Sequence, residues 1–131
     1  MTASPSPRRP SPSRVESFRF AFSGLWYALR AQPNAQIHAV ITVSTLALGA
    51  WLGLSRSEWA IIALTIGLVW AAELFNTALE VLVDLASPGL HPLAKIAKDV
   101  SAAAVLVSAI MAVIVGLLLF GPPLWITLFR H

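Results

Sequence analysis

Residues 73–84 read Glu73-Leu-Phe-Asn-Thr-Ala-Leu-Glu-Val-Leu-Val-Asp84 and place polar side chains inside a long apolar segment. The polar positions follow one another at i, i+3, i+4, i+7 and i+11: Glu73, Asn76, Thr77, Glu80 and Asp84. In an α-helix they project into a sector about 100° wide, so they form one stripe, here called the polar stripe. Ionisable groups in a membrane are costly and are retained mainly where they bind a charged partner or move a proton. The polar stripe is therefore the candidate active site.

The composition around this stripe is that of a membrane protein. Of 131 residues, 57% are hydrophobic and 11% are charged, with a mean hydropathy of +0.77, whereas about a quarter of the residues in soluble domains are charged. A helical span needs about 20 apolar residues, and the sequence predicts three spans, at about 35–54, 57–86 and 93–120. We expect no separate soluble catalytic domain. The absence of cysteine excludes disulfides, thiolate metal sites and a cysteine nucleophile.

The segment before the first span divides into two parts. Residues 1–14 are rich in proline, serine and arginine and predict a disordered tail, which leaves 15–131 as one membrane domain. Residues 15–31 carry large apolar side chains at helical spacing: Phe18, Phe22, Leu25, Trp26 and Leu29. This pattern predicts an amphipathic helix lying at the membrane surface. We expect Pro33 and Asn34 to interrupt it before the first span.

The distribution of basic residues predicts the orientation. Five arginines precede the first span, and Lys95 and Lys98 follow the second. The positive-inside rule then places the N-terminus and the second loop in the cytoplasm, and the first loop and the C-terminus outside. We expect the inner or plasma membrane of a bacterium, with the active site on the cytoplasmic side. Because aromatic and basic residues are not interleaved, a nucleic-acid partner is not expected.

This orientation sets the depth of the polar stripe. Glu73 lies about 24 Å along the second helix, a few ångströms inside the cytoplasmic edge of a core about 30 Å thick. Glu80, one turn after Asn76, offers oxygen ligands suited to Mg²⁺, and Lys98 offers a positive charge for phosphate. Glu73 can accept a proton from a hydroxyl group. The set suits phosphoryl transfer, which depends on positioning and charge neutralisation, although the sequence has no Walker A motif or kinase glycine-rich loop.

Two motifs carry a resemblance to a known family. Glu73 to Asp84, followed by His91-Pro-Leu-Ala-Lys95-Ile-Ala-Lys98-Asp99, closely resembles the prokaryotic diacylglycerol kinases, which include undecaprenol kinases. The likeness covers about residues 17–120. It implies an all-α homotrimer with an N-terminal surface helix and three transmembrane helices per protomer. It also implies Mg-ATP as the phosphoryl donor and sites shared between neighbouring protomers.

The resemblance assigns roles residue by residue. It implies that Glu73 is the catalytic base, Glu80 a metal ligand and Asn76 a supporting residue of the cofactor site. It implies further that Lys98 and Asp99 contact the nucleotide. Gln32 stands where many relatives carry a second metal-binding glutamate. Its neutral amide oxygen can still serve the metal and nucleotide, with one negative charge fewer.

The lipid substrate and the rival interpretations follow from the same residues. Ile37-His38 and His91-Pro-Leu-Ala-Lys95 resemble the undecaprenol kinase branch more than the diacylglycerol branch. The resemblance therefore implies undecaprenol as the substrate, with diacylglycerol, giving phosphatidic acid, as the alternative. Polar residues of a span can also simply hold helices together, but carboxylates on one stripe repel each other unless a cation lies among them. A small ion-coupled transporter and a non-catalytic assembly subunit are the other candidates, and a site near the cytoplasmic edge speaks against transport. We expect Gly49-x-x-x-Gly53 to form a close-packing surface.

Overall fold

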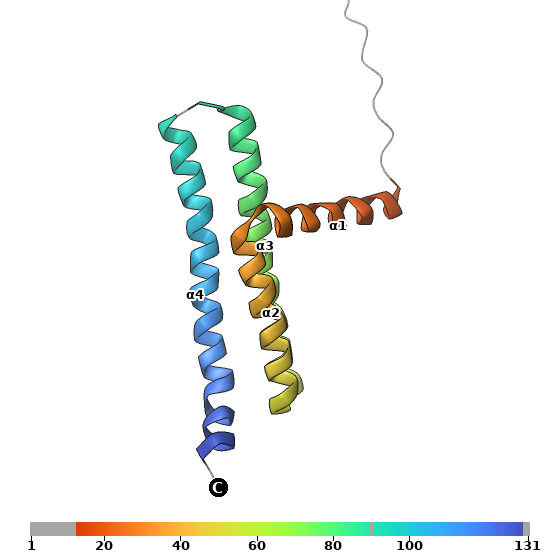
Figure 1. Cartoon of the computed structure of the whole chain (residues 1–131), viewed down its shortest axis with the longest axis vertical. Helices are drawn as coiled ribbons and strands as arrows, with labels where there is room; N and C mark the ends of the chain where they lie inside the picture. The colour runs from red at the N-terminus through yellow and green to blue at the C-terminus, as the bar shows by residue number, and fades with distance from the viewer. Residues whose placement is uncertain (1–12, 90, 130–131) are drawn as a thin grey trace, which may run out of the picture.

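The computed structural model describes residues 13–89 and 91–129, which form four α-helices and no strand (Figure 1). α1 spans Arg14–Ala31, α2 Pro33–Leu52, α3 Arg56–Ala86 and α4 Pro92–Phe129. α2, α3 and α4 are each long and apolar enough to cross a membrane. They run lengthwise in Figure 1, and α1 runs crosswise to them. The prediction of an all-helical membrane protein with three spans is confirmed.

The start of α1 is a capping box. The backbone N–H of Glu16 donates to the Ser13 hydroxyl at 3.3 Å, and the Ser13 N–H donates to the Glu16 carboxylate at 2.7 Å. These two bonds satisfy N–H groups that the first helical turn leaves without partners. The backbone N–H of Ser13, followed by its side chain, stabilises the charged carboxylate and lowers the pKa of Glu16 below its ordinary value. Of the predicted tail, residues 1–12 lie outside the described residues, whereas Ser13 and Arg14 belong to the helix start.

The corner between α1 and α2 is a single residue. Gln32 has an extended backbone, with φ −113° and ψ 115°, and Pro33 is already the first residue of α2. Pro33 and Asn34 therefore begin the second helix instead of forming a linker, because proline suits a first helical turn that needs no N–H partner. The amide of Gln36 donates to the carbonyl of Leu29 at 3.2 Å and joins the two helices across the corner.

The two glycines of the Gly49-x-x-x-Gly53 pattern have different roles at the end of α2. Gly49 is buried, and a Cβ there would lie 3.0 Å from the Trp59 ring and 3.1 Å from the Leu54 side chain. Gly53 instead has φ +68° and ends α2, with nothing within 4 Å of an added Cβ. The close-packing prediction therefore holds for Gly49 within the described residues, while Gly53 is needed for its left-handed backbone.

The last two helices pack along one another and give the domain its length. α4 has 38 residues, about 57 Å at 1.5 Å per residue, which exceeds a bilayer core of about 30 Å. It continues past the predicted end of the third span at residue 120, through Pro122 and Pro123, to Phe129. In apolar surroundings the helix keeps its remaining backbone hydrogen bonds because no water competes for them.

The interior of the described chain is unusually polar. Buried apolar side chains are Ala28, Ala35, Ile62, Val69, Val105 and Phe120, and buried polar ones are Glu73, Asn76, Thr77 and Ser108. Most large apolar side chains of the three long helices are exposed on the single chain. An apolar exterior suits lipid or a neighbouring helix, and polar groups collected between helices suit a membrane site. The fold thus buries the first part of the polar stripe, Glu73 to Thr77, and leaves Asp84 exposed at its end.

Candidate active site

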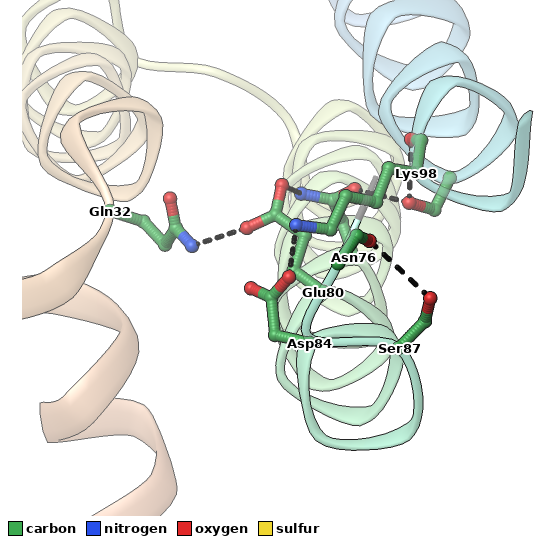
Figure 2. A network of polar contacts seen from close by, with 8 residues as sticks. Gln32, Asn76, Glu80, Asp84, Ser87 and Lys98 are labelled. Atoms are coloured by element: carbon green, nitrogen blue, oxygen red, sulfur yellow. Dashed lines mark hydrogen bonds and ion pairs between the residues drawn. The ribbon is translucent and has the colours of Figure 1, made fainter. Parts of the chain in front are cut away.

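Glu80 is the centre of a hydrogen-bond network near the C-terminal end of α3 (Figure 2). The side-chain amide of Gln32 donates to one carboxylate oxygen of Glu80 at 2.6 Å, and the amide of Asn76 donates to the other at 3.1 Å. Asn76 and Glu80 meet because residues four apart lie on the same face of a helix. Gln32 arrives from the corner between α1 and α2. Both oxygens of this carboxylate are thus bound by neutral amides.

Ser101 extends the network to α4 and was missed from the sequence. Its hydroxyl lies 2.7 Å from the Asn76 amide oxygen and 2.9 Å from the backbone carbonyl of Lys98. Because an ionised carboxylate only accepts hydrogen bonds, the Asn76 amide turns its N–H₂ toward Glu80 and its oxygen toward the Ser101 hydroxyl, which donates to it. The available signal was the position of Ser101 three residues after Lys98, on the same side of the helix.

The charged residues beyond the network form two ion pairs. Lys98 donates to Asp84 at 2.5 Å and joins α4 to α3, with 38% of the lysine side chain and 67% of the aspartate exposed. Lys95 pairs with Asp99 within α4. Lys98 therefore faces the polar stripe, whereas Asp99 is 59% exposed and is held by Lys95. The structure brings Gln32, Glu80, Asn76 and Lys98 to one end of the bundle, while Asp99 is paired with Lys95.

Glu73 lies two turns before Glu80 on α3, and its surroundings are quite different. It is 1% exposed, the largest fully buried side chain of the described residues. Neither of its carboxylate oxygens has a hydrogen-bond partner among those residues. Thr77 is also buried, but its hydroxyl donates to the backbone carbonyl of Glu73 at 2.9 Å and not to the carboxylate. A buried carboxylate without donors is destabilising, and its free lone pairs can accept a proton from a bound hydroxyl.

The donor set around Glu80 can be tested for magnesium. Within residues 13–89 and 91–129, no three His, Asp or Glu side chains cluster closely enough to hold a metal by themselves. Mg²⁺, however, commonly takes one or two carboxylates and completes its shell with water and substrate phosphates. One carboxylate of Glu80 with the amide oxygens of Gln32 and Asn76 fits such a site. Each amide has to turn its oxygen toward the ion and give up its bond to Glu80.

An apolar groove begins one turn from Glu73. It has a volume of about 380 Å³ between α2, α3 and α4, and Val69 and His38 line it near the polar stripe. Phe120 lies in its lining on α4, and three threonines supply polar groups to it: Thr42, Thr45 and Thr65. The indole N–H of Trp70 donates to the Thr42 hydroxyl at 3.0 Å and ties α2 to α3 beside the groove.

Comparison with known proteins agrees with the motifs of α3 and α4. The family model described as prokaryotic diacylglycerol kinase matches residues 19–120. The chain is 46% identical to an undecaprenol kinase of Bacillus subtilis over 109 residues, 83% of this chain and 89% of that one. It is 47% identical to a diacylglycerol kinase of Synechocystis over 115 residues, 87% of this chain and 66% of that one. A diacylglycerol kinase of Escherichia coli K12 is 27% identical over 100 residues, 76% of this chain and 82% of that one. These matches do not favour a transporter, and the chain belongs to the prokaryotic diacylglycerol kinase family.

Proposed function

We propose that this protein is a membrane lipid kinase that transfers the γ-phosphoryl group of ATP to the hydroxyl of a lipid alcohol. Undecaprenol is the preferred candidate, and diacylglycerol is the alternative. The observation that carries the proposal is the pairing of two unlike carboxylates on one face of α3. Glu73 is buried without donors, and Glu80, two turns away, is held by amides. One of the relatives at 46% and 47% identity is named an undecaprenol kinase and the other a diacylglycerol kinase. The resemblance of the sequence around His38 and His91 to undecaprenol kinases favours undecaprenol.

The mechanism follows from the placement of these side chains. Glu73 takes the proton of the lipid hydroxyl as its oxygen attacks the γ-phosphorus, and the bond to the β-phosphate oxygen breaks as ADP leaves. Lys98 turns from Asp84 to the phosphates and offsets their negative charge. Glu80, Asn76 and Gln32 would hold Mg²⁺ together with the nucleotide. When bound, that ion neutralises phosphate charge and orients the γ-phosphoryl group.

The lipid and the nucleotide reach the site from opposite sides. The groove between α2, α3 and α4 leads away from Glu73 into the apolar part of the bundle, and it suits a prenyl or acyl chain. The Lys98 end of the site is exposed, and we place it in the cytoplasm with the N-terminus. α1 runs crosswise as a surface helix at that boundary (Figure 1), with the Arg30 guanidinium 4.6 Å from the centre of the Trp26 ring. The membrane is the bacterial inner or plasma membrane.

A homotrimer with shared sites completes the arrangement. One protomer leaves most large apolar side chains of α2, α3 and α4 exposed. The three helices of one chain bury Glu73, but they leave Glu80 half-buried and Asp84 exposed. Neighbouring protomers would cover this open part of the polar stripe and exclude water from the reacting hydroxyl, which strengthens the electrostatic interactions at the site.

Lipid phosphorylation with γ-labelled ATP tests the proposal directly. Purified protein in detergent is given Mg²⁺ and either undecaprenol or diacylglycerol. Label in undecaprenyl phosphate is the expected result, whereas label in phosphatidic acid would keep the reaction and replace the substrate. No label in either lipid, from protein shown to be trimeric, would overturn the proposal and direct attention to ion uptake without ATP.

Two variants test the assigned roles. Glu73→Gln should fold and assemble but lose turnover by about 10²–10⁴-fold, the usual contribution of a general base. Lys98→Met should raise the KM for ATP, with little loss of stability because its ion pair is partly exposed. Wild-type turnover in Glu73→Gln would refute the base, and an unchanged KM in Lys98→Met would refute the phosphate contact.

A further inference from the structure

We propose that Gln32 is a positioning residue that docks the corner between α1 and α2 onto α3 without a metal ion, through its bond to Glu80. The active-site end of the protein is then assembled before nucleotide and Mg²⁺ arrive. The inference concerns the site of the proposed function. Its test measures the stability of the free protein, so the two proposals can fail separately.

The first argument is the place of Gln32 in the chain. It is the one residue between the last residue of α1 and the first of α2. Its amide reaches Glu80, 48 positions along the chain, at 2.6 Å (Figure 2). Backbone contacts between α1 and α3 are few compared with those between α3 and α4. Within the described residues, the bond from Gln32 is the side-chain hydrogen bond that ties this corner to α3. Together with the packing of buried Ala28, this bond therefore fixes the direction in which α1 leaves the bundle.

The second argument is the chemistry of the acceptor. An ionised carboxylate only accepts hydrogen bonds, so the group that faces Glu80 at 2.6 Å has to be a donor. Asn76 supplies the other donor, and Ser101 holds it in that orientation. The amides thus bind both oxygens with charge-assisted bonds, which are stronger than bonds between neutral groups. The free protein needs no cation to hold Glu80 in place.

The third argument is what a charge at position 32 would do. A glutamate there has nearly the shape of glutamine, but it would place a second carboxylate within hydrogen-bond distance of Glu80. Two carboxylates at that distance repel unless a proton or a cation lies between them. The corner would then require a divalent ion to stay closed. The neutral amide of Gln32 therefore makes docking of α1 independent of magnesium.

The test compares thermal unfolding in EDTA and in Mg²⁺, with no nucleotide or lipid. Wild type should unfold at the same temperature in both. Gln32→Glu should lose several degrees in EDTA and recover them in Mg²⁺. Gln36→Glu is the matched control, because Gln36 is exposed and donates to the Leu29 carbonyl instead of a carboxylate. Any effect of Gln36→Glu should be the same in both solutions.

Three results would overturn the inference. Wild type that loses stability in EDTA would show that the native site needs a cation. Gln32→Glu that matches wild type in both solutions would show that no docking bond exists. If Gln32→Glu cannot be purified, Gln32→Met removes the bond without adding charge. That variant should unfold several degrees below wild type in both solutions and expose α1 to proteolysis sooner. A Gln32→Met protein as stable and as protected as wild type would also overturn the proposal.

Discussion

The opposite surroundings of Glu73 and Glu80 predict stability changes of opposite sign when each is replaced by methionine. Glu73 is 1% exposed with both oxygens lacking partners among the described residues. A buried polar group without partners costs about 1–3 kcal/mol, and more if it is charged. Methionine fills a similar volume without polar atoms. Glu73→Met should therefore raise the free energy of unfolding by about 1–3 kcal/mol, which is about 5- to 150-fold in the unfolding equilibrium.

Glu80→Met should lower the same free energy. It removes the acceptor of two hydrogen bonds, at 2.6 Å from Gln32 and 3.1 Å from Asn76. Bonds to a charged group contribute about 1.5–3 kcal/mol each when buried. Since Glu80 is partly exposed, we expect a total loss of about 1–3 kcal/mol. Both variants should be inactive, so that activity alone does not distinguish them.

Reversible unfolding in mixed micelles measures both changes, with size-exclusion chromatography to check that the assembly is unchanged. The sign of the stability change in Glu73→Met shows whether the Glu73 carboxylate lacks a partner. If Glu73→Met is destabilised as much as Glu80→Met, the Glu73 carboxylate has a partner in the assembled protein. The argument that its lone pairs are free for a substrate proton would then be refuted.

Three further predictions concern the helices. Gly49→Ala should destabilise the protein by about 1 kcal/mol through overpacking, because its Cβ meets Trp59 at 3.0 Å. Gly67→Ala has open space for its Cβ in one protomer and should instead stabilise the protein by about 1 kcal/mol through helix propensity. Thermal unfolding measures both changes. A Gly67→Ala protein less stable than wild type would show that a neighbouring protomer packs at this position. The bonds from Ser13 lower the pKa of Glu16, so their contribution is full above the pKa of the unfolded chain and is lost as the pH falls through the lowered value. The gap in unfolding temperature between wild type and Glu16→Ala should narrow in acid, and a gap that widens would contradict this sign.

Local helix geometry explains why much of the site could be predicted. The polar stripe needs only the 3.6-residue repeat, and the structure places Asn76 and Glu80 in direct contact as that repeat requires. The same geometry shows why Asp99 does not join Lys98. Adjacent residues project about 100° apart on a helix, so a lysine that faces α3 leaves the next side chain turned away. The resemblance grouped the two residues as nucleotide contacts, and the contact of Asp99 stays a prediction.

Contacts between distant segments could not be obtained in this way. The bond from Gln32 to Glu80 depends on where a one-residue corner docks against another helix. No periodicity in the sequence encodes that position, and Gln32 entered the prediction through the resemblance alone. Ser101 was missed because its spacing of three residues from Lys98 does not by itself mark a residue of the site. Its role depends on the approach of α4 to Asn76.

The division of labour between the two carboxylates can be argued without any relative. Seven residues of helix separate Glu73 from Glu80 by about 10 Å along the axis, with the apolar groove beginning on the Glu73 side and the exposed Lys98 on the Glu80 side. A residue already surrounded by donors is poorly placed to take a proton, but well placed to hold a cation and phosphates. A carboxylate without donors is well placed to take a proton and poorly placed to hold a cation and phosphates. Pairs of like groups in unlike surroundings commonly divide acid–base and binding roles in this way. A reaction between a hydroxyl in the membrane and a phosphate in water needs both carboxylates on one helix that crosses the membrane boundary. The proton acceptor has to lie on the membrane side and the phosphate site on the water side.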